Sequence, residues 1–170
     1  FSMQAFHFSK EVAGGAIAIG PDGKRFTDEK YKNRHGKVPL HGSWKKMPTP
    51  CPMNMIFDHG HMRAGPLWDA TPRHGWTQII EKYEWSEDNS AELAKGWIKS
   101  ADTVEGLAEN IGVNPAALAD TVARWNAGCD ASADPEYGRS MMLNPIVEAP
   151  FYAIEMSPCM LNTQGGPRRN

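Results

Sequence analysis

Short hydrophobic runs near both ends of the chain predict β-strands. Residues 14–19 are small and mostly apolar, and they precede the sequence Gly-Pro-Asp-Gly at 20–23. Proline suits the second position of a β-turn and glycine the fourth, so residues 14–29 are expected to form a hairpin. Residues 53–58 predict a short buried strand and residues 151–156 a further one. After the Ser-Pro break at 157–158, another extended piece is expected at 159–163.

The middle of the chain carries a helical period instead. Apolar residues recur three or four positions apart in two consecutive segments, 100–112 and 114–128. Ser100 or Asp102 is a candidate cap for the first segment, and a glycine at its end suits a left-handed stop. Asn114 is a natural N-cap for the second, and a proline follows it directly. The two segments therefore predict a helical hairpin.

Other segments are less regular. Residues 75–85 could form a helix with one aromatic and aliphatic face, and residues 90–97 a shorter one. Residues 31–52 are rich in Lys, Gly, His and Pro and lack a sustained period, which predicts a long loop and hints at a working surface. Strands at both ends that flank central helices indicate an α+β class rather than a doubly wound sheet.

Size and charge limit the classes of protein. The chain has 170 residues, of which 41% are hydrophobic, and its formal net charge is −2. These values describe one globular domain with a core of its own. No basic stripe is interleaved with aromatic residues, so we expect no nucleic-acid partner. The longest apolar runs are far shorter than the roughly 18 residues needed to span a bilayer, so we expect no transmembrane segment.

Cysteines and termini add two expectations. The three cysteines, Cys51, Cys129 and Cys159, are too scattered for a disulfide framework, and at least one must be unpaired. The chain lacks an initiator Met and a targeting segment, so it reads as a fragment excised from a longer protein. Its localisation cannot be inferred from the sequence.

Isolated motifs do not identify a chemistry. The chain has no nucleophile elbow around a serine and no G-x-G-x-x-G loop for a dinucleotide. His59 and His61 resemble a metal pair, but no further ligand stands at a recognised spacing, so exposed or hydrogen-bonded imidazoles in a loop are the favoured interpretation. If a flavin or a nicotinamide is used, most of its binding must come from other sequence.

Three segments, taken together, resemble one family. Residues 14–29 contain Gly-Lys-Arg-Phe-Thr-Asp-Glu and resemble the family stretch G-K-R-F-x-N-E. Residues 107–126 resemble the pattern L-A-x-x-x-G-I-D-x-x-x-L-x-x-T-V-x-R-Y-N, and residues 151–166 resemble Y-A-I-x-x-x-P followed by H-T-M-G-G. The three occur in family order across nearly the whole chain. The family is the FAD-dependent superfamily of fumarate reductase, succinate dehydrogenase flavoproteins and 3-ketosteroid dehydrogenase.

The resemblance implies an architecture and an activity. Residues 1–170 correspond to the substrate-binding capping domain, which in this family is inserted into a Rossmann-like FAD domain. The implied reaction is flavin-mediated reduction or desaturation of a C–C bond next to a carboxylate or a ketone, with FAD bound mainly by the absent domain. The implied partners are a small organic substrate and the FAD-binding domain of the same polypeptide. The cap would exclude water and position an acid, and the isolated fragment is expected to be inactive.

The resemblance also implies catalytic residues. Glu29 matches the relay glutamate, and Arg34 lies one residue later than the relay arginine of the family. Arg63 follows a strand that ends in Phe-Asp, as the proton-donating arginine does, although Met62 could occupy that position instead. Each has a structural alternative: Glu29 could pair with a neighbouring Arg25 or lysine at the surface, and Arg63 could cap a helix or bridge to a carboxylate.

The last motif implies the substrate boundary. Asn162 stands where fumarate reductases place a histidine that holds a substrate carboxylate, and an amide brings no positive charge there. This departure argues against fumarate itself. Thr163 and Gln164 would line the substrate site, and Gly165 and Gly166 would allow close backbone approach to the flavin.

Two other functions remain open from the sequence. One is a non-catalytic module for small-molecule or protein interaction that is derived from the same fold, which the replaced histidine and the displaced arginine would allow. The other is a metal-dependent hydrolase that uses His59 and His61.

Overall fold

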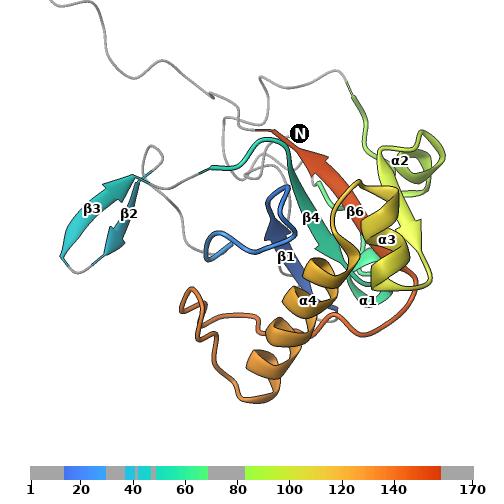
Figure 1. Cartoon of the computed structure of the whole chain (residues 1–170). Coiled ribbons are helices and arrows are strands. Elements are labelled where there is room, and N and C mark those ends of the chain that lie inside the picture. The colour runs from blue at the N-terminus through green and yellow to red at the C-terminus, as the bar shows by residue number, and fades with distance from the viewer. Residues whose placement is uncertain (1–13, 30–36, 41, 47–48, 69–82, 158–170) are drawn as a thin grey trace, which may run out of the picture.

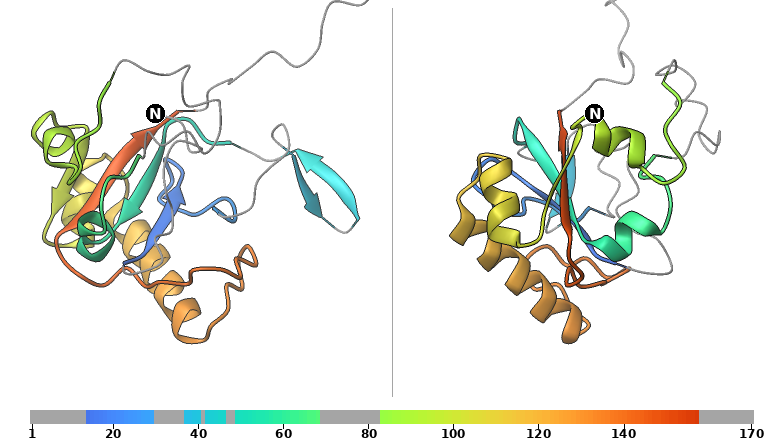
Figure 2. Two further views of the ribbon diagram at one scale, coloured as in Figure 1. Left: turned by 180° about the vertical axis from the view of Figure 1, so that it is seen from behind. Right: turned by 90° about the vertical axis from the view of Figure 1, so that its right-hand side faces the viewer.

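A four-stranded antiparallel sheet forms the centre of the computed structural model, and helices lie on both of its faces (Figures 1 and 2). The strand order is β1 (Ala16–Ile19), β4 (Met53–Phe57), β6 (Phe151–Met156) and β5 (Ile98–Ala101). The structure describes residues 14–29, 37–40, 42–46, 49–68 and 83–157. Strands from the two ends of the described chain therefore join one sheet, with β4 between β1 and β6. The strands predicted near both ends are confirmed.

The two faces of the sheet carry separate parts of the core. In β4, which lies inside the sheet, every residue is buried, so both of its faces are covered. Met55 pairs with Ile154 of β6, and the two side chains belong to one cluster. Ile56 pairs with Ala153, and these belong to the cluster on the opposite face. This alternation follows from the two-residue period of a strand.

Helices α3 (Val104–Asn110) and α4 (Pro115–Asp130) cover one face. The predicted helical hairpin is thus confirmed, together with the Asn114 N-cap, whose side chain accepts from the backbone N–H of Ala117 at 3.0 Å. The cap of α3 is Thr103, not Ser100 or Asp102, because Thr103 has the extended backbone that a cap needs and its hydroxyl accepts from the backbone of Gly106. Ser100 lies in β5 instead.

Two short helices lie on the other face. Helix α1 (His59–Arg63) follows β4 directly, and α2 (Ser90–Ala94) is the shorter helix expected within 90–97. Met62 and Leu67 are buried in the cluster on this face, and Trp85 and Leu93 pack against it. None of the described helices is long and apolar enough to cross a membrane.

One predicted loop contains strands. Within 31–52, strands β2 (Lys37–Leu40) and β3 (Ser43–Lys46) form an antiparallel pair that Figure 1 draws apart from the central sheet. The prediction was wrong there because a proline inside β2 hides the strand pattern, while Gly42 supplies the left-handed turn with φ of 75°.

Other expectations have mixed outcomes. The turn at 20–23 is confirmed, with a bond from the N–H of Gly23 to the carbonyl of Gly20, but only an isolated bridge joins Ile19 to Arg25 after it. Most of the helix expected at 75–85 lies outside the described residues, and residues 83–85 are not helical. The extended piece expected at 159–163 also lies outside them.

Candidate functional site

Glu29 lies inside the molecule. Its carboxylate accepts hydrogen bonds from Arg25 Nε at 3.0 Å and from the second Arg25 amino group at 2.9 Å, and it pairs with Arg139 at 3.2 Å. It also accepts from the backbone N–H of Ala18 in β1 at 3.1 Å. The Glu29 side chain is 0% exposed, and both arginine side chains are 1% exposed.

Asp134 completes this group, which we call the buried charge network: Arg25, Glu29, Asp134 and Arg139. Arg25 donates two hydrogen bonds to the Asp134 carboxylate, each 3.0 Å long. The guanidinium carbons of Arg25 and Arg139 lie 4.6 and 4.7 Å from the centroid of the Trp125 ring. Two cations and two anions thus balance, and an aromatic ring adds a cation–π contact to each arginine.

The pKa values follow from these contacts. Burial alone would lower the pKa of Arg25, but the hydrogen bonds and charges of Glu29 and Asp134 raise it above its ordinary value. Burial alone would raise the pKa of Asp134, yet the hydrogen bonds and charge of Arg25 and backbone N–H donors hold it below its ordinary value. Arg25 and Asp134 are therefore both ionised at neutral pH.

The network also covers part of the outer edge of β1, where no further strand of the described chain pairs. Arg139 donates to the carbonyl of Ala16 at 2.9 Å, and Glu29 accepts from the N–H of Ala18, so side chains bond two outward backbone groups of β1. Glu29 does pair with Arg25, as one sequence alternative had it, but the pair is buried rather than at the surface. Sequence reasoning missed Asp134 and Arg139, because nothing in their irregular segment signals a partner more than a hundred residues earlier in the chain.

Arg63 occupies a different place. It is the last residue of α1, and its guanidinium forms an ion pair with Glu148. The two side chains are 56% and 40% exposed, so this pair faces outward in the described chain. The alternative in which Arg63 bridges to a carboxylate is confirmed, and its described partner is Glu148 rather than Glu29. The neighbouring Met62 is buried in the core.

Asp58 joins α1 to the segment that carries Glu148. This carboxylate, 1% exposed, accepts from the backbone N–H of His61 at 3.0 Å and so caps α1. Its second oxygen accepts from the backbone N–H groups of Val147 at 3.2 Å and Glu148 at 3.3 Å. An aspartate between a strand and a polar helix start is an N-cap signal that the sequence already contains.

The two histidines lie in helix α1, so the expected loop was wrong, because the Asp58 cap lets the helix begin at His59. The expected hydrogen-bonded imidazole is confirmed for His59. His61 is fully buried, and the Nδ1 atom of His59 lies 3.2 Å from the Tyr152 hydroxyl. Within the described ranges, no three His, Cys, Asp or Glu side chains are placed to hold a metal ion.

Several candidates lie outside the described residues. Arg34 is one of them, and the others are the substrate-boundary and flavin-boundary residues Asn162, Thr163, Gln164, Gly165 and Gly166.

A sequence-family profile described as "FAD binding domain" matches residues 8–168. The chain belongs to this FAD binding domain family. FAD is the cofactor of the family, and the sequence-based assignment to these flavoproteins is confirmed.

Relatives and solved structures agree with this membership. A digoxin reductase of Eggerthella lenta is 45% identical over 71 residues, which are 42% of this chain and 13% of that protein. An NADH:acrylate oxidoreductase of Vibrio harveyi is 44% identical over 75 residues, 44% of this chain and 8% of that protein. A probable fumarate reductase of Shewanella frigidimarina is 28% identical over 93% of this chain and 23% of its own length. This chain thus spans a quarter or less of these relatives.

Two solved structures share the fold. The open conformation of a flavocytochrome c3 fumarate reductase has a TM-score of 0.52 and 19% identity, over 92% of this chain and 22% of that chain. A 3-ketosteroid delta1-dehydrogenase from Sterolibacterium denitrificans has a TM-score of 0.60 and 22% identity, over 89% of this chain and 28% of that chain. The mixed helix and sheet fold expected from the sequence is confirmed.

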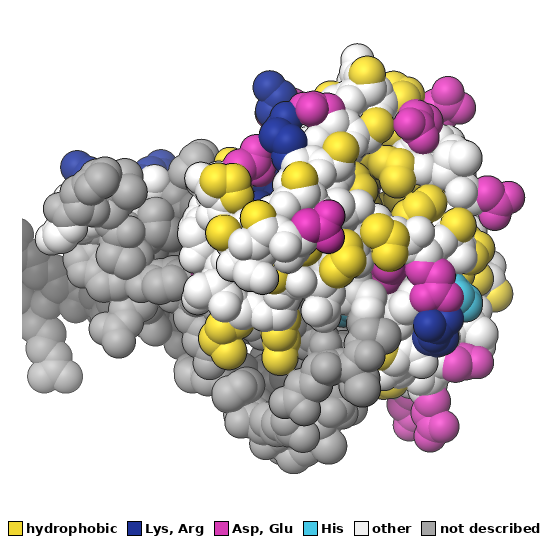
Figure 3. All heavy atoms as spheres, turned by 90° about the horizontal axis from the view of Figure 1, so that it is seen from below, with side chains coloured by type: hydrophobic (Ala, Val, Ile, Leu, Met, Phe, Trp, Pro, Cys, Tyr) yellow, Lys and Arg dark blue, Asp and Glu magenta, His cyan; other side chains and the backbone are white. Residues whose placement is uncertain are grey.

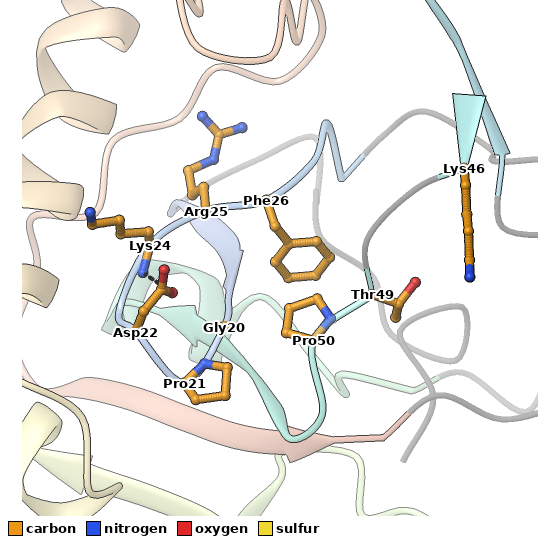
Figure 4. A pocket seen from close by; sticks show the side chains of 9 residues that line it. All are labelled: Gly20, Pro21, Asp22, Lys24, Arg25, Phe26, Lys46, Thr49 and Pro50. Atoms are coloured by element: carbon orange, nitrogen blue, oxygen red, sulfur yellow. Dashed lines mark hydrogen bonds between the residues drawn. The ribbon is translucent and has the colours of Figure 1, made fainter. Parts of the chain in front are cut away.

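The described residues of this family member do not by themselves form a cradle for FAD. Their central sheet is antiparallel, whereas a dinucleotide site of the Rossmann type uses parallel strands and a glycine-rich turn into a helix. The open hollow drawn in Figure 4 lies between the turn at 20–23 and Pro50, where Phe26 and Pro50 are side by side and the Arg25 guanidinium points away. This hollow contains no Glu29 or Arg63, and no glycine-rich phosphate loop.

Proposed function

We propose that this chain is the substrate-binding cap of an FAD-dependent oxidoreductase that reduces or desaturates a C–C bond next to a carboxylate or a ketone. The observation that carries the proposal is the unequal coverage: 93% of this chain aligns with only 23% of a probable fumarate reductase. The aligned part lacks a nucleotide cradle among its described residues. A cap that closes over a flavin held by another domain of the same polypeptide has these two properties.

The names of the relatives suggest the substrate class. Acrylate, urocanate and fumarate, which occur in the names of three of them, are acids whose C=C bond is conjugated to a carboxylate. The amide of Asn162, in place of a histidine, offers a hydrogen bond without a positive charge. We therefore propose an unsaturated acid or related compound other than fumarate.

The chain's own residues would bind, orient and shield. Arg63 is the proposed proton donor, because it is a cation at the outward end of α1 with its side chain 56% exposed. Asn162, Thr163 and Gln164 are the proposed substrate contacts, with Gly165 and Gly166 at the flavin. An arginine stays protonated in water at neutral pH, so it can act as an acid only in a site from which water is excluded.

The relay remains part of the proposal in a modified form. Glu29 is held between two arginines in the buried charge network and has no described contact with Arg63. It could act on Arg63 only through further residues, for which Arg34 is the proposed link.

Turnover of reduced flavin in the full-length protein tests the proposal. The flavin is reduced without oxygen and mixed with acrylate, urocanate or fumarate, and the return of its visible absorbance is followed, with propionate as the saturated control. We expect acrylate or urocanate to reoxidise it faster than fumarate or propionate does. Arg63→Gln should lower that rate by several orders of magnitude while FAD stays bound. A full-length protein without flavin, or one that responds equally to all four acids, contradicts the proposal.

One observation favours the second candidate, a non-catalytic interaction module. Met62, at the sequence position that could correspond to the catalytic arginine, is buried among apolar side chains. A module of this kind would bind an unsaturated acid, seen as a shift of the oxidised flavin spectrum, without reoxidising the reduced flavin.

A further inference from the structure

The carboxylate beside Arg63 is fixed more firmly than an exposed ion pair requires. Exposed pairs between flexible side chains contribute little to stability, because both side chains lose freedom when they pair. Here the backbone of Glu148 is held by contacts other than its ion pair with Arg63. Its backbone N–H donates to buried Asp58 at 3.3 Å, and its carbonyl accepts from the N–H of His59 at 2.9 Å.

The Glu148 side chain also lies against α1 on one side. A Cβ placed on Gly60 would lie 3.3 Å from Glu148 Oε2, so this oxygen sits against the first turn of α1. The same Cβ would lie 3.1 Å from the backbone of Gly14, so Gly14 also packs against this turn. The other carboxylate oxygen, Oε1, pairs with Arg63. Glu148 therefore meets α1 at both its beginning and its end.

Asp58 makes these contacts one rigid unit. Its two oxygens hold the N-terminus of α1 and the backbone at 147–148, and its burial excludes competing water. Hydrogen bonds to an ionised carboxylate are stronger than neutral ones. A movement of the Glu148 backbone relative to α1 would break hydrogen bonds to the buried Asp58 carboxyl group, which is costly.

We infer that Glu148 is the residue that positions Arg63 in the active site, held in place by Asp58. This inference rests on the proposed function, in which Arg63 meets the substrate. Glu148 aims the guanidinium, and Asp58 sets the distance between Glu148 and α1. The buried charge network that contains Glu29 supports the sheet edge instead, so the carboxylate next to Arg63 comes from the segment before β6.

A double-mutant cycle in the full-length protein tests the inference, with kcat and KM measured for the best unsaturated acid. Glu148→Gln should lower kcat by about tenfold or more with a smaller change in KM. Glu148→Asp, which keeps the charge, should recover part of that loss. In the Arg63→Gln background, Glu148→Gln should cause no further loss, since its effect passes through Arg63.

Asp120→Asn is the matched control, because Asp120 also forms an exposed ion pair with an arginine, Arg124, on α4. Its kcat should equal that of wild type, and thermal unfolding should show that every variant is folded with FAD bound. A Glu148→Gln variant with wild-type kcat overturns the inference and leaves the proposed function standing. The inference is also overturned if the losses of kcat caused by Arg63→Gln and Glu148→Gln add in the double variant. If no unsaturated acid reoxidises the reduced flavin of the wild-type protein, the proposed function is overturned, and the inference with it.

Discussion

Glu29 and Arg139 are 110 residues apart in the chain, yet their charged groups meet at 3.2 Å with almost no exposure to solvent. Arg139 also bonds the carbonyl of Ala16, and Glu29 bonds the N–H of Ala18. Two side chains thus occupy the edge positions where a fifth strand would otherwise pair. An unpaired edge is a site for unwanted strand pairing, so this arrangement protects β1 as well as linking distant segments.

Replacing Glu29 with alanine should therefore loosen the edge of the sheet. The change leaves Arg139 and the Ala18 N–H without their bonds to a buried carboxylate, and removing one member of a buried ion pair costs about 3–5 kcal/mol. Hydrogen exchange in the full-length protein should show β1 amides opening with a free energy lower by about that amount. Asp120→Asn, at an exposed pair, should change stability by less than about 1 kcal/mol. Unchanged β1 exchange in Glu29→Ala would contradict the edge role.

The buried charge network should also weaken in acid. The pKa of Asp134 is held below its ordinary value, mainly because hydrogen bonds from Arg25 outweigh the effect of burial. A carboxyl whose folded pKa is lowered contributes stability above its unfolded value, about 3.9, and loses it as the pH falls through the folded pKa. Protection of residues 134–142 against hydrogen exchange should thus decline below about pH 5.

Asp134→Asn supplies the control for this pH effect. It removes the titrating group, so protection of the same segment should be lower at neutral pH and should depend less on pH below about 5. Equal acid sensitivity in wild type and Asp134→Asn would show that another group governs the transition.

Elements that depend on interactions between nearby residues could be predicted from the sequence. Asn114 followed by proline marks the start of α4, because capping and the fixed proline φ act within a few residues. Strand β5 was missed, since only Ile98 is fully buried in it and its strand form depends on pairing with β6 more than fifty residues later. Sequence patterns report burial and turns well, but not pairing between distant segments.

The site shows the same limit. The family resemblance selected Glu29 and Arg63, and the first motif contains Arg25, one partner of Glu29. Neither motif indicates Arg139 or Glu148. Arg139 meets Glu29 and Glu148 meets Arg63 from the irregular segment between α4 and β6, where no period fixes a residue's position. Only the folded chain, which places that segment across the end of the sheet, brings these charges together.

Figure 3 shows the resulting surface from below, with hydrophobic side chains among acidic ones and basic side chains that form no continuous patch.

The thiol of Cys129 should react slowly. Burial, the largest cause, raises its pKa to about 11, so only about one thiol in ten thousand is ionised at pH 7. A short pulse of iodoacetamide, followed by mass spectrometry of peptides, should label Cys129 much more slowly in the native than in the unfolded protein. Its labelling rate should rise about tenfold per pH unit up to about pH 10, since the thiolate is the nucleophile. Native labelling at pH 7 as fast as in the unfolded protein would contradict the assigned burial.

Substitutions of Asn89 separate the effect of its left-handed backbone from that of its side-chain hydrogen bonds to the end of α1. Its backbone is left-handed, with φ of 63°, and its buried amide makes four bonds. The carbonyl oxygen accepts from the Leu67 N–H at 2.7 Å and the Trp85 indole at 2.8 Å, and the amide nitrogen donates to the carbonyls of Met62 and Gly65 at 3.1 and 3.0 Å. The carbonyls of Met62 and Gly65 lie on either side of Arg63 in the sequence, so Asn89 holds the C-terminal end of α1.

If the hydrogen bonds dominate, Asn89→Gly and Asn89→Ala should both destabilise the fold by about 3 kcal/mol or more, because each net bond contributes about 1 kcal/mol and the orphaned groups are buried. Glycine should be the milder change by about 1 kcal/mol, since it adopts the left-handed backbone without strain. Thermal unfolding of the full-length holoprotein, with hydrogen exchange of residues 59–67, measures both effects. Wild-type stability in Asn89→Gly would mean that the backbone conformation alone matters, and the end of α1 would then have to be held by its contacts with the core, through Met62, rather than by the amide.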